Sequence, residues 1–168
     1  MMVKLTHNLP PQRRLHRMRR QILLLLISVL LLANCDRSTL LHSYQPVKDN
    51  CWERTDTLRF DLPELTSDDN CCMLLGLRVT NSFPYEKLVI EIEQRYQNPM
   101  GQRVDTVYYQ LTDESGDFTE NGLNYFQYES QRIPLDIKKG QKGEIRIRHL
   151  MHREALPGIM DVGVHVIR

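Results

Sequence analysis

Apolar and polar side chains alternate with a period of two along several short segments of this chain. The clearest is residues 88–93, where the leucine and isoleucines would share one face of a strand and Glu91 and Glu93 would share the other. This pattern predicts a half-buried β-strand with the two glutamates on its solvated face. An acid–base pair would instead require both carboxylates to line a cleft.

Further strands follow from the same pattern and from the turn residues between them. Residues 72–79 are more continuously apolar and indicate a central strand. Residues 104–111 are expected to pair back against residues 88–93 as a hairpin across the turn at residues 98–101. Pro63 ends an earlier alternating segment, because a proline has no N–H to donate to a neighbouring strand. The remaining predicted strands are residues 57–62, 125–128, 132–137, 144–149 and 160–166.

These strands predict an all-β fold, an antiparallel β-sandwich of about seven or eight strands. Turn residues recur about every eight to twelve positions, which is the spacing expected of a sandwich. The sequence contains no convincing amphipathic helix, and a helix-like pattern is confined to residues 151–156, just before Pro157 and Gly158. We therefore expect one β-sandwich domain over residues 51–168.

A different pattern precedes the predicted domain. Residues 22–33 form a single apolar stretch of twelve positions, whereas a membrane-spanning helix needs roughly 20 apolar residues. Six basic residues lie between Lys4 and Arg20, and no acidic residue occurs before Asp36. A basic segment followed by a short apolar core is typical of a signal peptide, so residues 1–34 are predicted to direct export.

The apolar stretch ends at Leu32-Ala33-Asn34-Cys35, which resembles a lipobox. Its asparagine departs from the small residue usual at that position, so a short uncleaved anchor and plain secretion remain alternatives. A thiolate at Cys35 can attack a diacylglyceryl donor and form a stable thioether, which predicts covalent lipid attachment there. Two or three acyl chains hold a protein on a membrane far more firmly than one. The polar residues 35–50 would then form a lipid-anchored tether.

Removing the signal peptide changes the charge balance. The whole chain has a formal net charge of +1, whereas residues 35–168 carry 16 Lys and Arg against 21 Asp and Glu, a formal −5. A mildly acidic domain gives no electrostatic reason to bind nucleic acid or an anionic lipid surface. We therefore expect no nucleic-acid partner.

Three cysteines remain if Cys35 carries lipid. In an oxidising compartment a bridge from Cys51 to either Cys71 or Cys72 is plausible, and the odd number leaves at least one other thiol. A bond between the neighbours Cys71 and Cys72 would be strained. Alternatively, all three are small buried hydrophobes. No CxxC pair or His/Cys spacing indicates a zinc site.

Candidate catalytic chemistry is sparse. His149, His152 and His165 could be read as metal ligands, but a ligand set needs a further group that the sequence does not place. No GxSxG motif, P-loop or nucleophile elbow occurs. We expect no catalytic residues, no metal and no cofactor, and therefore a protein that is not an enzyme.

Aromatic side chains are numerous for this length. Tyr108 and Tyr109 are adjacent, so one is expected to face the core and the other solvent or a partner. Exposed members could form a protein-binding patch or a sugar-stacking platform, and ordinary packing on sheet faces is the simpler explanation. The set comprises Trp52, Phe83, Tyr85, Tyr108, Tyr109, Tyr125, Phe126 and Tyr128.

Several motifs together resemble the GldH family of gliding-motility lipoproteins. The resemblance covers nearly the whole chain after the signal peptide, and the motifs occur in the order expected for that family. They are the lipobox followed by Asp36, Trp52 with DTLRF at 56–60, LGLR at 75–78, FPYEKL at 83–88 and MHREALPGIMDVG at 151–163.

The resemblance implies a membrane-anchored lipoprotein of the cell envelope, with other envelope proteins as partners and the membrane reached through covalent lipid. It implies no catalytic residue and no cofactor. A non-catalytic structural or interaction component of the motility or associated envelope machinery is therefore predicted, and an envelope glycan-binding sandwich is the alternative. Some residues match the family pattern and could support a binding surface or, through an Arg–Asp pair, fix loops: Trp52, Arg78, Tyr85, Arg153 and Asp161.

Replacing the predicted lipidation site tests the interpretation of the N-terminus. The Cys35→Ser variant lacks the thiolate that thioether formation requires, so it should carry no lipid and leave the membrane fraction. The native chain, fractionated and weighed as an intact protein, should have the mass of residues 35–168 plus lipid. A native chain that keeps residues 1–34 and gains no lipid would contradict the prediction.

Overall fold

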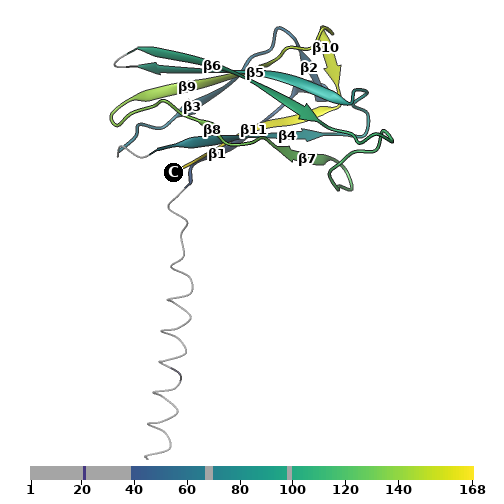
Figure 1. Cartoon of the computed structure of the whole chain (residues 1–168), viewed down its shortest axis with the longest axis horizontal. Coiled ribbons are helices and arrows are strands. Elements are labelled where there is room, and N and C mark those ends of the chain that lie inside the picture. Colours follow the sequence, from purple (N-terminus) through teal and green to yellow (C-terminus); the bar gives the residue numbers. More distant parts are fainter. Residues whose placement is uncertain (1–20, 22–38, 67–69, 98–99) are drawn as a thin grey trace, which may run out of the picture. The chain divides into compact units, whose positions relative to one another are not determined.

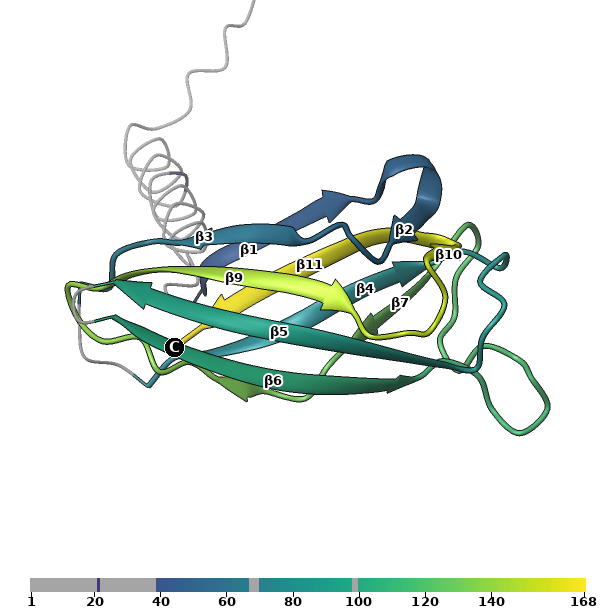
Figure 2. The same cartoon turned by 90° about the horizontal axis from the view of Figure 1, so that it is seen from above.

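Two antiparallel sheets pack face to face in the computed structural model, which describes residue 21 and residues 39–66, 70–97 and 100–168 (Figures 1 and 2). The predicted all-β antiparallel sandwich is confirmed. Cys35 and all of the predicted signal peptide except Gln21 lie outside the described residues, so both assignments stay predictions. A search of the described residues finds no helix that is long and apolar enough to cross a membrane.

Sheet I has the strand order β1-β11-β4-β7, and β8 also pairs with β4. Its strands are β1 (Thr39–Pro46), β11 (Ile159–Ile167), β4 (Cys72–Val79), β7 (Phe126–Glu129) and β8 (Ile133–Pro134). Sheet II has the order β3-β9-β5-β6. Its strands are β3 (Leu58–Leu62), β9 (Lys142–His149), β5 (Lys87–Gln97) and β6 (Gly101–Gln110). A short ribbon joins β2 (Cys51–Glu53) to β10 (Ala155–Pro157), and the 3-10 turn η1 (Lys48–Asn50) precedes it.

Most of the predicted strands are present. The expected hairpin is β5 with β6, in register from Lys87 opposite Gln110 to Tyr96 opposite Gly101. β4 is the predicted central strand, because it lies between β11 on one side and β7 and β8 on the other. The alternating pattern of β5 also holds, so its apolar side chains face the other sheet and its glutamates face outward.

The core lies between the two sheets and is built from the alternating apolar positions of both. Inward-facing side chains of β4, β5, β9 and β11 are almost fully buried, because period-two alternation places every second side chain on the inner face. Representative members are Leu75, Leu77, Ile90, Ile92, Ile147, Val162 and Val164. Burial of this shared apolar face is what holds the two sheets together.

The predicted tether over residues 35–50 is wrong for Thr39–Pro46, which forms β1 and pairs with β11 along its length. Its segment reads as polar because β1 is an edge strand and its side chains are half-buried or exposed. Pairing with β11 satisfies its backbone groups, which a tether would leave to water. The sandwich therefore begins at Thr39 rather than at residue 51.

One side chain of β1 fits over two glycines of the neighbouring strands. Tyr44 lies on the outer face of sheet I over Gly163 of β11 and Gly76 of β4, which are directly opposite each other. A Cβ at Gly163 would lie 2.6 Å from Cδ1 of the Tyr44 ring, and a Cβ at Gly76 would meet the Tyr44 hydroxyl. Glycine is therefore required at both positions for the ring to lie flat against the sheet.

The helix-like assignment of residues 151–156 is wrong. Ala155–Pro157 is strand β10, which pairs with β2 so that Leu156 lies opposite Trp52. Gly158 follows with a φ of +88° and packs against the backbone of Phe83, where a Cβ would meet the Phe83 nitrogen at 2.5 Å. Pairing with a strand more than 100 residues earlier overrides the local pattern, since short segments have weak intrinsic helix preference.

The strand predicted at residues 132–137 is reduced to the two residues of β8. Burial still alternates through Ile133, Leu135 and Ile137, which are all buried. Beyond Pro134, the nitrogen of Leu135 donates to the Cys71 oxygen at 3.0 Å, just before β4 begins. Alternation here thus reports a half-buried segment lying along the sheet edge rather than a full strand.

The cysteine bridges considered from the sequence are also wrong. Cys51 pairs with Pro157 at one end of the sandwich, whereas Cys72 pairs with Ile167 at the other. Ten residues at about 3.3 Å each separate these partners, roughly 30 Å along the strand direction. A disulfide requires Cα atoms within about 7 Å, and Cys71 precedes Cys72 directly, so neither bridge from Cys51 can form in this fold.

A substitution that fills the space under Tyr44 should destabilise the fold. Gly163→Ala is expected to lower the free energy of unfolding by about 1–3 kcal/mol, because the new methyl group displaces the ring. Chemical denaturation would measure the change, and Gly101→Ala, whose new Cβ would meet only Tyr96 at 3.5 Å, is the control with a small effect. If Tyr44→Ala fails to remove most of the Gly163→Ala penalty in the double variant, the steric explanation is incorrect.

Candidate functional site

The two long edges of the sandwich differ. At one edge β1 and β3 are joined, because Nε2 of Gln45 donates a hydrogen bond to the Arg59 oxygen at 2.5 Å. At the other edge sheet II ends with β6, and sheet I ends with two short strands, β7 and β8, interrupted by residues 130–132 (Figure 2). The second edge is therefore open.

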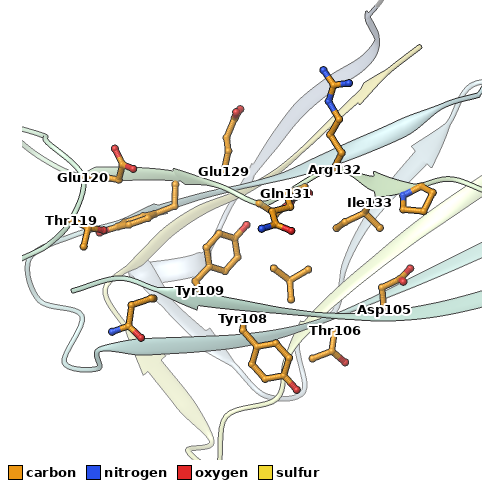
Figure 3. Close-up of a pocket in the computed structure, with 15 residues that line it drawn as sticks. Asp105, Thr106, Tyr108, Tyr109, Thr119, Glu120, Glu129, Gln131, Arg132 and Ile133 are labelled. Atoms are coloured by element: carbon orange, nitrogen blue, oxygen red, sulfur yellow. Dashed lines mark hydrogen bonds between the residues drawn. The ribbon is translucent and has the colours of Figure 1, made fainter. Parts of the chain in front are cut away.

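A cleft of about 620 Å³ lies at this open edge. β6 forms one wall, and the segment from Tyr128 to Pro134 forms the other, with Thr119 and Glu120 at one end. Figure 3 shows Tyr109 and Gln131 pointing into the space between the two walls, while Tyr108 points to the opposite side of β6. The prediction that the adjacent tyrosines face opposite ways is confirmed, since Tyr108 is 76% exposed and Tyr109 only 6%.

Two tyrosines tie the floor of the cleft to the sheets. The Tyr109 hydroxyl donates to the Leu75 oxygen at 2.6 Å, and the Tyr128 hydroxyl donates to the Leu111 oxygen at 2.6 Å. Burial raises the pKa of both Tyr109 and Tyr128, which keeps them protonated and able to donate at neutral pH. Both hydroxyls are therefore already hydrogen-bonded within the sandwich.

Ser130 explains the interruption between β7 and β8. Its backbone nitrogen donates to the Leu75 oxygen at 2.9 Å, and its Oγ accepts a hydrogen bond from the Leu75 nitrogen at 2.9 Å. The side chain thus replaces one half of a normal strand-to-strand pair, and Oγ also donates to the Gln131 oxygen at 2.7 Å. The chain leaves the sheet after Ser130, which opens the cleft.

A polar network closes one end of the cleft. Buried Gln94 on β5 donates through Nε2 to Asp105 at 3.0 Å and to the Pro134 oxygen at 3.1 Å. The Tyr96 hydroxyl donates to Oε1 of Gln94 and accepts from the Asp136 nitrogen at 3.0 Å. Burial raises the pKa of Tyr96 to about 12, so this hydroxyl stays protonated. The network links sheet II to the β8 segment.

Arg103 and Asp105 extend this network along the first half of β6. Arg103 Nε lies 3.0 Å from Asp105 Oδ2, and Nη1 lies 3.4 Å from Asp136 Oδ1. The hydrogen bond to Asp105 raises the pKa of the Arg103 guanidinium. Inward-pointing charges of this kind discourage another strand from pairing with an edge. Residues 106–110 of β6 contain no charged residue and no proline, so this protection ends at Asp105.

The family-pattern residues Arg78 and Asp161 are brought together. They lie opposite each other on β4 and β11, and Arg78 Nη1 is 3.6 Å from Asp161 Oδ2. The Arg78 guanidinium also lies over the Tyr44 ring at 4.2 Å and near the Tyr125 ring at 5.2 Å. The pair connects strands of sheet I on its outer face rather than loops.

The other family-pattern residues lie towards the end of the sandwich that carries β2 and β10. Trp52 is buried, and its Nε1 donates to the Asp56 oxygen at 3.1 Å. Tyr85 is half-buried and meets Phe83 edge to face at 5.5 Å, whereas Arg153 is exposed in the turn before β10. Trp52 is therefore a core residue, and its predicted surface alternative is wrong.

Sequence reasoning missed Tyr44 and the cleft. Gly76 and Gly163 interrupt two otherwise apolar strand patterns, and a glycine inside a strand often marks the close approach of another group. That signal could have indicated a large side chain over sheet I. The cleft depends on Ser130 and Gln131, and no local pattern distinguishes them from ordinary loop residues.

The aromatic side chains do not form a continuous exposed platform in the described part of the chain. Trp52, Phe83 and Tyr128 are buried, and Tyr85, Tyr125 and Phe126 are half-buried. Phe126 stacks on Phe118 at 4.2 Å. Most of the predicted set thus packs against the sheets, which leaves Tyr108 as the strongly exposed member.

The three histidines considered as metal ligands, and not expected to bind a metal, are separated. His149 is buried beside Trp52, with ring centroids 5.5 Å apart, and His165 stacks on His42 of β1 at 4.6 Å. His152 lies in the exposed turn before β10. Among the described residues, no group of three or more His, Cys, Asp or Glu side chains is placed to hold a metal ion.

The outer face of sheet II carries paired charges. Arg148 Nε lies 2.7 Å from Glu91, and Arg95 Nη2 lies 2.8 Å from Glu93. The hydrogen bond from Arg146 lowers the pKa of Glu144 on the same face. The predicted outward position of Glu91 and Glu93 is confirmed, and each carboxylate has an arginine partner. Such surface pairs contribute little stability individually.

The described residues thus form an antiparallel β-sandwich with one joined and one open edge, and a lipobox-like segment precedes it in the sequence. The family model described as GldH lipoprotein matches residues 39–166. A gliding motility lipoprotein GldH from Flavobacterium johnsoniae is 28% identical over 151 residues, which cover 85% of this chain and 93% of that protein.

The chain belongs to the GldH lipoprotein family. Membership in this family places it among the gliding-motility lipoproteins, which are anchored to a membrane of the cell envelope. The matched region begins at Thr39, so it coincides with the start of β1 and includes both sheets.

Protonation of His149 should lower the stability of the fold. Burial is the main cause that lowers the pKa of His149 from 6.5, and the charge of Arg54 adds to it, while a hydrogen bond with the Trp52 backbone and the charge of Glu154 oppose the shift. The unfolded chain therefore takes up the proton first as pH falls, so the free energy of unfolding should decrease below about pH 6.5.

Thermal unfolding between pH 8 and pH 5 would measure this dependence. His149→Leu removes the titrating ring from its buried position and should flatten the decline, whereas His152→Gln changes only an exposed histidine and should not. An equal decline in the native chain and in the His149→Leu variant would assign the effect to other groups.

Proposed function

We propose that this chain is a non-catalytic component of the gliding-motility or associated envelope machinery that binds an extended segment of another envelope protein along β6. The single observation that carries the proposal is the unprotected half of an edge strand, residues 106–110, lying beside a cleft of about 620 Å³. Family membership supports the setting, and the open edge supports the mode of binding.

The unpaired edge of β6 suits the addition of a strand from another protein. The outer side of β6 pairs with no strand in the described part of the chain, so its N–H and C=O groups are available to an extended polypeptide. Alternate side chains of an added strand point to opposite faces. One set would enter the cleft over Val107 and Tyr109, and the other would pass Tyr108 on the outer face. A partner segment with apolar residues at alternate positions would place these residues in the cleft and its remaining side chains beside Tyr108.

The predicted lipid on Cys35 fits the same role, because it would keep the sandwich beside other proteins of the envelope. Tyr109 and Tyr128 already use their hydroxyls for internal hydrogen bonds, so their rings offer apolar contacts to a side chain that enters the cleft. The acceptors at the rim include Gln131 and Glu129. No catalytic group and no cofactor are part of the proposal.

Matched substitutions on β6 test the binding site. Val107 is half-buried and faces the cleft, whereas Val104 is 52% exposed on the other face of the same strand. Val107→Asp should reduce cross-linked complexes recovered from intact envelopes at least about tenfold, because it places a charge where apolar side chains are expected. Val104→Asp should leave most of the complex intact. Mass spectrometry of the cross-linked peptides would identify which residues of this chain contact the partner.

A second measurement avoids substitutions on β6 that could cause misfolding. A photoreactive residue at Gln131 leaves β6 unchanged and should cross-link to a discrete envelope protein, whereas the same residue at Leu123, on the loop before β7, should not. Equal loss of complexes in both valine variants, or cross-linking to polysaccharide alone, would contradict the proposal. The second result would favour the glycan-binding alternative.

A further inference from the structure

The start of β1 and the C-terminus lie at the same end of the sandwich (Figures 1 and 2). Thr39 is paired with Ile167, and Ile167 is also opposite Cys72 at the start of β4. In sheet II the same end contains Lys142, which is opposite Gln97. We call this the anchor-proximal end, defined by Thr39, Met100, residues 134–142 and Arg168.

Chain length limits how far this end can be from the lipid. Only three residues separate Cys35 from Thr39, and an extended chain spans at most about 3.6 Å per residue, so Cα of Thr39 lies within about 14 Å of Cα of Cys35. A tether over the whole of residues 35–50 would have allowed about 50 Å. Because residues 39–46 belong to sheet I, a lipid on Cys35 holds the anchor-proximal end close to the membrane surface.

This end presents a rigid group of lysines. Lys138 and Lys139 are exposed on the turn before β9, and Lys142 is exposed at the first position of β9. Buried Gln141 fixes the turn through two hydrogen bonds. Its side-chain Oε1 accepts from the backbone nitrogen of Lys138 at 2.8 Å, and its backbone nitrogen donates to the backbone oxygen of Lys138 at 3.0 Å. The Gly140 nitrogen donates to the Leu65 oxygen at 2.8 Å, which attaches the turn to the segment after β3.

The opposite end of the sandwich carries an acidic loop. The loop after β6 contains Asp113, Glu114, Asp117 and Glu120, all exposed. Oδ1 of Asp113 accepts hydrogen bonds from the nitrogens of Ser115 at 2.8 Å and Asp117 at 3.1 Å, which orders the loop. The anchor-proximal end carries exposed carboxylates as well, at Asp61, Glu64 and Asp136, so its charges are mixed, whereas the loop after β6 is acidic throughout. The formal charge of −5 for residues 35–168 is therefore unevenly distributed along the sandwich.

We propose that the anchor-proximal end lies against anionic lipid headgroups, with Lys138, Lys139 and Lys142 contacting lipid phosphates and Met100 at the interface. The proposal rests on the lipid attachment at Cys35. Basic side chains within a Debye length of an anionic surface are attracted to it, and the acidic loop at the far end is repelled. Both effects orient the strands perpendicular to the membrane. β6 then runs away from the membrane, and its unprotected half, residues 106–110, is the part farther from the lipid.

Tryptophan quenching in vesicles tests this orientation. Met100 and Leu123 are both fully exposed apolar residues, 95% and 103%, at opposite ends of the sandwich. The full lipidated chain with Met100→Trp or Leu123→Trp would be reconstituted into phosphatidylglycerol–phosphatidylcholine vesicles that carry a spin-labelled headgroup. After subtraction of the signal from the native Trp52, Met100→Trp should be quenched at least about threefold more than Leu123→Trp.

Charge reversal isolates the part played by the lysines. Lys138→Glu, Lys139→Glu and Lys142→Glu combined with Met100→Trp should remove most of the extra quenching in anionic vesicles, and pure phosphatidylcholine vesicles should give the same loss with the native lysines. Equal quenching at both ends, or quenching that ignores both changes, would overturn the proposal. The intact mass of the same samples distinguishes failure of the proposed orientation from failure of the predicted anchor. A chain without lipid on Cys35 would refute lipid attachment itself.

Discussion

The antiparallel pairing of β4 with β11 is the constraint on which the rest of the structure depends. It places Gly76 opposite Gly163, which makes room for Tyr44 and so for β1 on one side. It also places Arg78 opposite Asp161, so that the guanidinium can meet both the carboxylate and the Tyr44 ring. On its other side β4 carries β7 and β8, and through Leu75 it sets where the cleft opens.

The two edges of the sandwich follow from what β4 and β11 can hold. On the β11 side, β1 is paired over its full length and is joined to sheet II through Gln45. On the β4 side, Ser130 ends the pairing of β7, and the chain returns to the sheet only at Ile133. Family membership gives the chain its place in the cell envelope, and the proposed binding site uses the open edge.

Much of the fold could be predicted from the sequence, because alternation reports directly which side chains face the core. The β5–β6 hairpin and the central position of β4 followed from that pattern. β1 was missed because an edge strand with half-exposed side chains reads as a polar segment. β10 was missed because its three residues are defined by a distant partner, β2, and not by their own preferences.

The candidate site was harder to predict than the fold for a related reason. Arg78 and Asp161 emerged from the family resemblance, but their cross-strand contact required the register of two strands far apart in sequence. The cleft requires even more, since it forms where Ser130 replaces a backbone partner with its own hydroxyl. Its buried tyrosines were visible as aromatics, although nothing local distinguished Tyr109, which lines the cleft, from Tyr108, which faces away.

The pairing of β1 with β11 also has a mechanical consequence. A lipid on Cys35 would transmit any pull from the membrane to Thr39, the first residue of β1. A pull along the axis of β1 would slide β1 past β11, so the ladder hydrogen bonds between Thr39 and Pro46 would resist together instead of opening one after another. The ring of Tyr44, seated on the two glycines, adds a steric stop to the same movement. With lipid on Cys35, β1 would join the membrane to the sandwich as a connection loaded in shear.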